Sequence, residues 1–436
     1  MKWLDTLIEL LLIFLIAFSP LIYGSITILP LRIVETTCLV LLVILLMRMF
    51  YTGQIRIVKV PILPLFLFLV LVIFQLTPLP TSLIAVISPA TLSFSSSTRF
   101  SILPLSIDPK TTFDMLVQLL SYLAAFFVVL NYVDTEKKGK KLIATIIICG
   151  FLYSMFGIIR KFSTPALGFS TFTNRNHFAS YVELIIPLTI AYSLVEYDKI
   201  KKFFAIFMAS VMVLALLFSS SRAGTISLLL GFVIFMLLVK FKFPLRKGLS
   251  SFIYLSLILG LFLAAIGSNS ISKKLESLRN PLKAMSGRIE VLQDAPSIIA
   301  DFPVFGTGLG TFHDIFPKYK TFKSLVYRFA HNEPLQLVIE TGFLGFILVA
   351  VFLALYLNTI FIVWIKRHYP YAVCISLGCV VGLISVGLHS FFEFMLHVPA
   401  VTILFFVNLA VAFRSVHMGR KQGELPVPSW SFNLKK

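Results

Sequence analysis

The sequence predicts an all-α polytopic membrane protein, a single membrane domain over residues 1–436 with about 12 transmembrane helices. Hydrophobic residues make up 58% of the chain and charged residues 13%, against about 45–50% and about 25% in soluble domains. Mean hydropathy is +0.95, so the chain has more apolar surface than a water-soluble fold could bury. The apolar residues also gather in runs of about 20, the length that crosses a bilayer.

The predicted transmembrane helices follow one another along the whole chain. They cover residues 7–29, 31–50, 61–79, 113–133, 142–162, 178–197, 203–219, 224–241, 249–267, 334–365, 371–390 and 398–415. The first has one Lys ahead of its apolar run, as a signal peptide has, but the run continues to Leu29 and no small-x-small cleavage site follows. We therefore expect an uncleaved first helix.

Two polar stretches interrupt this pattern, at 80–112 and 268–333. The second has 66 residues and lies between the ninth and tenth predicted helices. It is the only stretch long enough to form a small structured lid, and we expect it to be partly helical, with a helix from about 288 to 301.

Basic residues in the short connecting segments orient the chain, because Lys and Arg are concentrated on the cytoplasmic side of a membrane. With a cytoplasmic N-terminus, the cytoplasmic segments hold 22 Lys and Arg and the short non-cytoplasmic loops hold seven. Both termini are therefore expected in the cytoplasm. This distribution between apolar segments accounts for the net charge of +19 without a nucleic-acid partner.

Arginine outnumbers lysine by five to two in the short non-cytoplasmic loops. Arg222 follows three serines at the mouth between two helices. It either extends to lipid head groups or clamps a phosphate, which a guanidinium binds through two parallel hydrogen bonds. Arg288 begins the helix of the large loop, where a helix N-terminus attracts anions. It would hold a phosphate or pair with Glu290 or Asp294.

His331 lies in the run Arg328-Phe329-Ala330-His331-Asn332-Glu333-Pro334, which begins a long helix with Pro in the tolerated first turn. Asn332 or Glu333 can cap that helix. An imidazole just outside the membrane can accept a proton near neutral pH, and it can equally be an ordinary hydrogen-bonding residue.

Glu340 lies deeper in the same predicted helix. At about 100° per residue it faces away from His331 and shares a face with Glu333 and Gln336, so it should not form a dyad with His331. A buried acid needs a partner, and we expect an Arg from another non-cytoplasmic segment. Its role is structural or functional.

His389, Glu393 and His397 recur every four residues near the end of a late helix. A metal triad is one interpretation, but Pro399 and the drift of this spacing around the helix favour an ordered His–Glu pair instead. The glycines of Gly306-Thr307-Gly308-Leu309-Gly310 lack a preceding strand and a downstream ribose-binding acid, so we interpret this run as a loop and not as a nucleotide site.

Several of these segments resemble the O-antigen ligase/polymerase superfamily of bacterial envelope glycosyltransferases. The resemblance extends from about residue 170 to 400. Its motifs are Thr173-Asn174-Arg175-Asn176-His177-Phe178-Ala179, Ser221-Arg222-Ala223-Gly224, Pro303-Val304-Phe305-Gly306-Thr307-Gly308-Leu309-Gly310-Thr311-Phe312, Ala330-His331-Asn332-Glu333, Glu340-Thr341-Gly342 and His389-Ser390-Phe391-Phe392-Glu393-Phe394. The sequence departs from the family's pattern at Glu393, where many relatives carry Asp.

The resemblance implies an enzyme of the bacterial inner membrane that transfers a glycan from an undecaprenyl-diphosphate donor in the periplasm. No metal and no cofactor take part, and direct displacement inverts the anomeric centre. Arg222 and Arg288 would hold the diphosphate, and His331 would act on the acceptor hydroxyl. Further residues expected to bind diphosphate or substrate are Arg175, His177, Arg328, Glu340, His389 and Glu393.

The acceptor separates the possible functions. A ligase transfers the glycan to the lipid A core, which the long loop after the ninth helix favours, whereas an O-antigen or exopolysaccharide polymerase uses another lipid-linked repeat. A lipid-glycan flippase or other transporter belongs to a different class. The absence of matching broken helices and the few polar residues near helix centres argue against a transporter.

Overall fold

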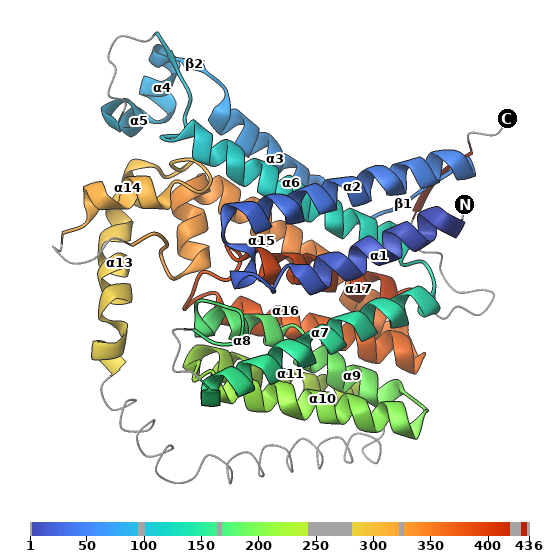
Figure 1. Ribbon diagram of the computed structural model, residues 1–436. Helices are drawn as coiled ribbons and strands as arrows, with labels where there is room; N and C mark the ends of the chain where they lie inside the picture. The colour runs from blue at the N-terminus through green and yellow to red at the C-terminus, as the bar shows by residue number, and fades with distance from the viewer. Residues whose placement is uncertain are drawn as a thin grey trace.

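The protein, described by a computed structural model, is mostly helical (Figure 1). The description covers residues 2–94, 101–163, 168–242, 281–321, 327–418 and 429–433, with the backbone alone at 54–56, 281–288 and 429–433. The helices are α1 (Lys2–Phe18), η1 (Tyr23–Ser25), α2 (Ile28–Thr52), α3 (Leu63–Leu76), α4 (Thr81–Ile87), α5 (Pro89–Phe94), α6 (Pro109–Tyr132), α7 (Glu136–Ser163), α8 (Arg175–Glu183), α9 (Ile186–Val195), α10 (Lys199–Phe218), α11 (Arg222–Lys242), α13 (Pro281–Asp301), α14 (Phe312–Tyr319), α15 (Glu333–Lys366), α16 (Pro370–His389) and α17 (Pro399–Val416). The strands are β1 (Gln54–Val58), β2 (Leu79–Pro80), β3 (Ile102–Leu103) and β4 (Ser429–Asn433).

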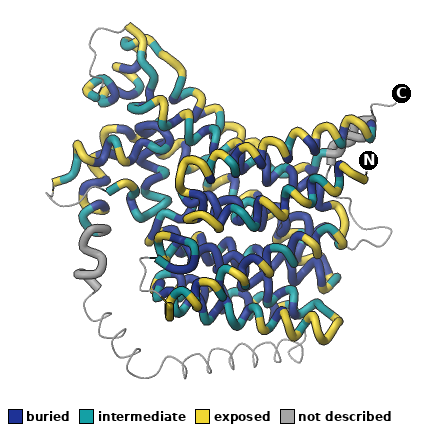
Figure 2. The backbone as a smooth tube through the Cα atoms, in the orientation of Figure 1, coloured by how far each residue is buried: buried dark blue, intermediate teal, exposed yellow. Residues whose placement is uncertain are grey.

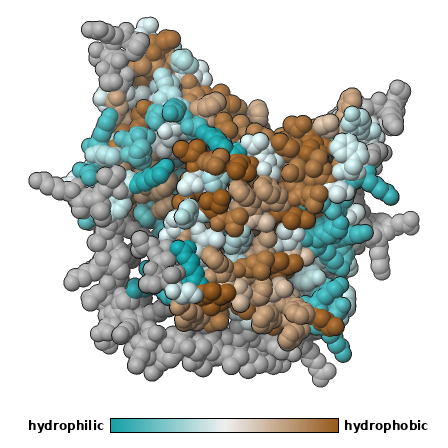
Figure 3. Space-filling view, viewed as in Figure 1, coloured by the Kyte–Doolittle hydropathy of each residue, from teal (hydrophilic) through white to brown (hydrophobic). Residues whose placement is uncertain are grey.

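The long helices pack side by side in one bundle (Figure 1). Its most buried members are α16, α17 and the α8–α9 pair, whereas α10, α11 and α15 leave most of their residues accessible (Figure 2). The outward side chains are apolar, among them Phe14 of α1, Val43 of α2 and Phe203 of α10. Figure 3 shows such side chains over the middle of the visible face, with hydrophilic ones at its ends. This pattern is the one that a surrounding bilayer requires.

The predicted all-α membrane fold is confirmed. Nine helices within the described residues are long and apolar enough to cross a membrane, and α1 and α3 are shorter, with 17 and 14 residues. The number of twelve is not confirmed, because the predicted helix at 249–267 lies outside the described residues.

The prediction of one continuous helix over 7–29 is wrong. α1 ends at Phe18, ahead of Pro20, because the ring of a proline disfavours helical backbone at the residue before it. The chain then makes a tight turn, in which Tyr23 and Ser25 have φ of 53° and 61°, and the Ser25 hydroxyl donates to the carbonyl of Ser19 at 2.8 Å. The next helix begins at Ile28.

The predicted helix at 178–197 is broken into α8 and α9. Pro187 has no N–H to donate to the carbonyl of Glu183, so the helical ladder cannot continue through this point. The side chain of Asn408 in α17 donates to the carbonyl of Leu184, next to the break, at 2.8 Å. This break lies next to Glu183, which contributes to the polar cluster described below.

The predicted helix at 334–365 is also interrupted, at Gly342 of α15, where φ is 66° and ψ is −178°. The glycine-rich segment 303–310 completes the hydrogen bonds at the break. Thr307 and Gly308 donate to the carbonyls of Ile339 and Glu340, and Phe343 donates to the carbonyl of Pro303, at 2.8 to 3.0 Å. The segment is a loop, as predicted, and its hydrogen bonds stabilise the break in α15.

The two polar stretches of the sequence pack against each other at one end of the bundle. α4 and α5 of the first lie beside α13 and α14 of the second, opposite the end where α1 begins (Figure 1). The ring of Phe94 contacts those of Phe302 and Tyr319, at centroid distances of 5.7 and 5.9 Å. α13 starts earlier than the predicted residue 288.

Candidate active site

The start of α15 positions His331 beside the loop that joins α16 to α17. Asn332 caps the helix, its side-chain oxygen accepting from the N–H of Leu335 at 2.9 Å, so the first of the two predicted caps is confirmed. The N–H of Glu333 donates to the carbonyl of Ser390 at 2.8 Å. His331 itself has φ of 52°, a left-handed backbone that costs free energy and is common at functional sites.

His331 is oriented by a buried carboxylate. Its Nδ1 is hydrogen bonded to Oε1 of Glu393, whose side chain is 1% exposed, whereas the imidazole is 26% exposed. The ring of Phe394 lies edge-on to the imidazole at 4.9 Å. With the proton on Nδ1, the lone pair of Nε2 is available to accept another proton. A histidine held in this way by a third group has the arrangement of a general base.

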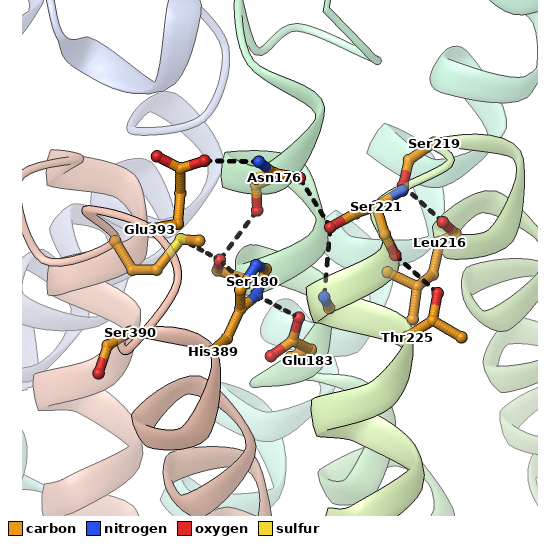
Figure 4. Close-up of polar contacts among 12 residues, drawn as sticks. Asn176, Ser180, Glu183, Leu216, Ser219, Ser221, Thr225, His389, Ser390 and Glu393 are labelled. Carbon is orange, nitrogen blue, oxygen red and sulfur yellow. Dashed lines mark hydrogen bonds and ion pairs between the residues drawn. The ribbon is translucent and has the colours of Figure 1, made fainter. Parts of the chain in front are cut away.

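The second oxygen of Glu393 is held from α8 (Figure 4). The side-chain amide of Asn176 donates to Oε2 of Glu393 at 2.5 Å, and its oxygen accepts from the hydroxyl of Ser221 at 2.8 Å. Ser221 directly precedes Arg222, the first residue of α11. A continuous series of hydrogen bonds therefore links three motifs that are distant in sequence.

A second, fully buried pair lies deeper in the same part of the bundle. Nδ1 of His389 is 2.8 Å from Oε1 of Glu183, and neither side chain is exposed. The hydroxyl of Ser180 lies between this pair and Asn176, donating to the Asn176 carbonyl at 2.9 Å (Figure 4). His177, at 4% exposure, packs edge-on to Phe394, and its ring nitrogens have no hydrogen-bond partner among the described residues.

Glu340 is buried and held by neutral donors. Its carboxylate accepts from the backbone N–H groups of Gly310 and Phe312, at 2.7 and 3.3 Å, and from the amide of Gln336 at 2.8 Å. The predicted shared face with Gln336 is confirmed. The prediction of an arginine partner is wrong for the described residues, because the loop at the break of α15 already supplies donors to this carboxylate.

His397 pairs with Glu333, with Nδ1 3.2 Å from the carboxylate. Burial of the ring lowers its pKa, but the charge and hydrogen bond of Glu333 and the charge of Glu340 outweigh burial, so the pKa of His397 is raised to about 8. The predicted series His389, Glu393 and His397 thus divides into three separate His–Glu pairs. Among the described residues, no group of three His, Cys, Asp or Glu side chains is placed to hold a metal ion.

The arginines of the site are in a different environment. Arg175 and Arg222 begin α8 and α11, and Arg328 precedes α15; all three are exposed. The guanidinium of Arg328 lies 5.7 Å from the ring centroid of Phe329. Arg288 is in α13, and its side chain lies outside the described part of the chain.

An apolar cavity of about 330 Å³ begins beside the His397–Glu333 pair. Leucine, phenylalanine and valine side chains of α3, α6, α15 and α17 form most of its wall, including Phe68, Leu337 and Phe405. Its polar end includes Glu333, Glu340 and His397. The cavity is open, so an apolar chain could enter it with its polar end close to the His331 motif.

Sequence reasoning missed the roles of Asn176, Ser221 and Glu183. Asn176 and Ser221 lie within two of the family motifs, but the sequence alone favours the neighbouring Arg175 and Arg222 as the functional residues there. Glu183 is an acid inside an apolar run, which is costly in a membrane without a partner. That cost was the available signal for its pairing with a histidine.

Residues 207–350 match the family described as O-antigen ligase. The matched part contains Ser221, Arg222, Arg288, His331 and Glu340, and ends beyond the break in α15. A search of curated proteins finds no match. The comparison confirms the resemblance drawn from the motifs: residues 207–350 carry the domain of the O-antigen ligase family, within the O-antigen ligase/polymerase superfamily.

Proposed function

We propose that the protein is a metal-independent, inverting glycosyltransferase that moves a glycan from an undecaprenyl-diphosphate donor to an acceptor hydroxyl. The observation that carries this proposal is the His331–Glu393 pair, in which a buried carboxylate orients an accessible imidazole. An oriented base of this kind contributes about 10²–10⁴-fold to a rate.

The reaction forms one bond and breaks one. The acceptor oxygen attacks the anomeric carbon, its proton passes to Nε2 of His331, and the bond from that carbon to the diphosphate oxygen breaks. The diphosphate leaves with the bonding electrons. Arg222 and Arg288 stabilise the negative charge that develops on it, since fixed cations in a partly dry site act most strongly where charge appears. Displacement from the opposite face inverts the anomeric centre.

The apolar cavity supports a lipid-linked substrate. Its wall, formed by α3, α6, α15 and α17, is mostly apolar, and its polar end includes Glu333, two residues from His331. An isoprenoid or acyl chain in the cavity would stay in an apolar environment while its head group reached the imidazole.

The distribution of Lys and Arg supports a periplasmic location for this chemistry. β1 and β4 pair with each other, and α1 begins at the same end of the bundle (Figure 1). The basic segments expected in the cytoplasm favour an orientation with that end inside and α13 and α14 outside. We therefore propose an inner-membrane enzyme with both termini in the cytoplasm and the 268–333 loop as a periplasmic lid within one domain.

The acceptor is proposed to be the lipid A core, with a second lipid-linked repeat as the alternative. Purified protein in proteoliposomes would be given the lipid-diphosphate glycan with either acceptor, and the product masses measured. Transfer to core lipid A identifies a ligase, and a doubled repeat identifies a polymerase. Intact donor moved across the bilayer without any change in mass would instead identify a transporter and overturn the proposal.

A further inference from the structure

We propose that Asn176 is a positioning residue for glycan transfer: its side-chain amide joins the Ser221 hydroxyl to the Glu393 carboxylate and thereby fixes His331 relative to Arg222. This inference rests on the proposed function. It assigns a role to a residue that would touch neither the glycan nor the diphosphate.

The carboxylate of Glu393 is restrained at both of its oxygens. One oxygen of this buried carboxylate is bound to His331, and the other accepts from Asn176 at 2.5 Å. With a fixed donor at each oxygen, the carboxylate cannot rotate about its terminal bond without losing a hydrogen bond, and buried acceptors lose free energy when left unpaired. Asn176 therefore determines the plane in which Glu393 meets the imidazole.

Ser221 links Asn176 to the turn that carries Arg222. The Ser221 hydroxyl donates to the Asn176 oxygen at 2.8 Å, accepts from the N–H of Gly224 at 3.3 Å, and belongs to the residue before Arg222. The carbonyl of Ser221 accepts from the hydroxyl of Thr225 at 2.8 Å. The turn between α10 and α11 is thus fixed at both its side chain and its backbone (Figure 4).

The backbone of Asn176 is itself held by hydrogen bonds. Its N–H donates to the side chain of Asn174 at 2.8 Å, and its carbonyl accepts from the hydroxyl of Ser180 at 2.9 Å. The residue lies in the first turn of α8, so its position follows that of the helix. An amide is suited to this place because it donates with one atom and accepts with another while remaining neutral.

The chemical consequence is a fixed distance between the two halves of the reaction. Attack on the anomeric carbon requires the base and the cations to act on atoms only a few ångströms apart. A displacement of about 1 Å in such a site costs about 10²-fold in rate. The hydrogen bonds of Asn176 to Ser221 and Glu393 fix the position of His331 relative to the Arg222 turn before the substrates bind.

The test measures steady-state transfer by the full-length protein in proteoliposomes, with a synthetic lipid-diphosphate glycan as donor. Asn176→Leu keeps a similar volume but can neither donate nor accept, and we expect kcat to fall by up to about 10²-fold while the donor KM stays within about twofold. Ser221→Ala should lower kcat in the same way, and Ser221→Thr, which restores a hydroxyl, should recover it. Ser210→Ala is the matched control, since it removes a hydroxyl of α10 whose hydrogen bond goes to the carbonyl of Ile206 in the same helix, at 2.8 Å, and its kcat should not change.

An unchanged kcat in Asn176→Leu, a rise in KM alone, or an equal loss in Ser210→Ala would overturn the inference. Should Asn176→Leu fail to fold, the Ser221 pair of variants decides the question. Failure of the proposed function looks different, because then the wild type transfers no glycan or His331→Ala transfers it normally. A wild type that needs His331 but not Asn176 would contradict this inference alone.

Discussion

The two halves of the candidate site differ in how they are held. On one side, His331 is bound by Glu393, which is almost fully buried and bound in turn by Asn176. On the other side, Arg175, Arg222 and Arg328 are exposed at or just before the first turns of helices.

This difference suggests a division of labour. A base must be aligned before the reaction, because its tautomer and direction decide whether it can take the acceptor proton. Cations that bind a diphosphate can complete their arrangement when the anion arrives, since a guanidinium forms strong paired hydrogen bonds with phosphate. The imidazole half is therefore preorganised. In the arginine half the turn that carries Arg222 is also fixed, and we expect only the exposed guanidinium groups to adjust to the substrate.

Removal of the charge that orients His331 should have the largest effect. Glu393→Gln keeps the size of the side chain but loses the carboxylate, and we expect kcat for glycan transfer to fall by about 10²–10⁴-fold, because the imidazole loses its preferred tautomer. Glu393→Asp keeps the charge and should retain more activity than Gln. Equal rates in wild type and Glu393→Gln would show that the pair is only structural.

Loss of the guanidinium tests the arginine half. Arg222→Ala should lower kcat by about 10²–10³-fold, the usual cost of removing one group that stabilises developing negative charge. Arg222→Lys keeps the charge but loses the planar guanidinium, so its kcat should lie between those of the wild type and Arg222→Ala. Arg32→Ala is the control, because Arg32 already pairs with Glu35 and Asp114 at 2.8 and 2.9 Å. A similar loss in the control would point to a general charge effect.

The broken helix α15 carries Glu333 and Glu340 at the polar end of the cavity, and its break should be sensitive to a single methyl group. A Cβ at Gly342 would lie 2.1 Å from the carbonyl oxygen of Val304, at a backbone φ that L-residues rarely adopt. We expect Gly342→Ala to lower the free energy of unfolding by at least about 1–3 kcal/mol. Thermal unfolding in detergent measures it.

Gly387→Ala in α16 is the matched control for that variant. A Cβ there meets no atom within 4 Å, so the helix should be unaffected or slightly stabilised. Equal melting temperatures for Gly342→Ala and wild type would contradict the packing of segment 303–310 on the break.

The smallest expected effect is the pH dependence of the His397–Glu333 pair. The pKa of His397 is raised from 6.5 to about 8, so the pair stabilises the folded protein fully below about pH 6.5 and loses that contribution as pH rises through about 8. The contribution is at most about 2 kcal/mol. The wild-type melting temperature should fall across this interval, and His397→Gln should abolish that part of the dependence. Parallel curves for the two proteins would rule out the pair as its source.

The sequence predicted most of the helices, because apolar runs of about 20 residues have few alternatives to a membrane-spanning helix. It failed at the breaks. Pro20 and Pro187 lie within apolar runs that hydropathy alone joins together, and the break at Gly342 depends on hydrogen bonds from segment 303–310, which is distant in the chain. Hydropathy is insensitive to such backbone pairing.

The candidate site shows the same limit. The motifs identified His331, Glu393 and Arg222 as residues of interest, but spacing along one helix suggested a relation among His389, Glu393 and His397. In the fold each of these binds a partner from another element, because the tertiary packing of α8 and α15 against the end of α16 decides the pairs. Sequence spacing cannot show contacts that the packing of separate helices creates.

A single-turnover measurement with His331→Ala tests the central claim most directly. Donor is bound to the reconstituted protein first, acceptor is then added, and the mass of the acceptor is followed with time. We predict that the wild type adds the glycan, and that His331→Ala still binds donor but forms product at least about 10²-fold more slowly. Product formation at the wild-type rate in His331→Ala would contradict the account.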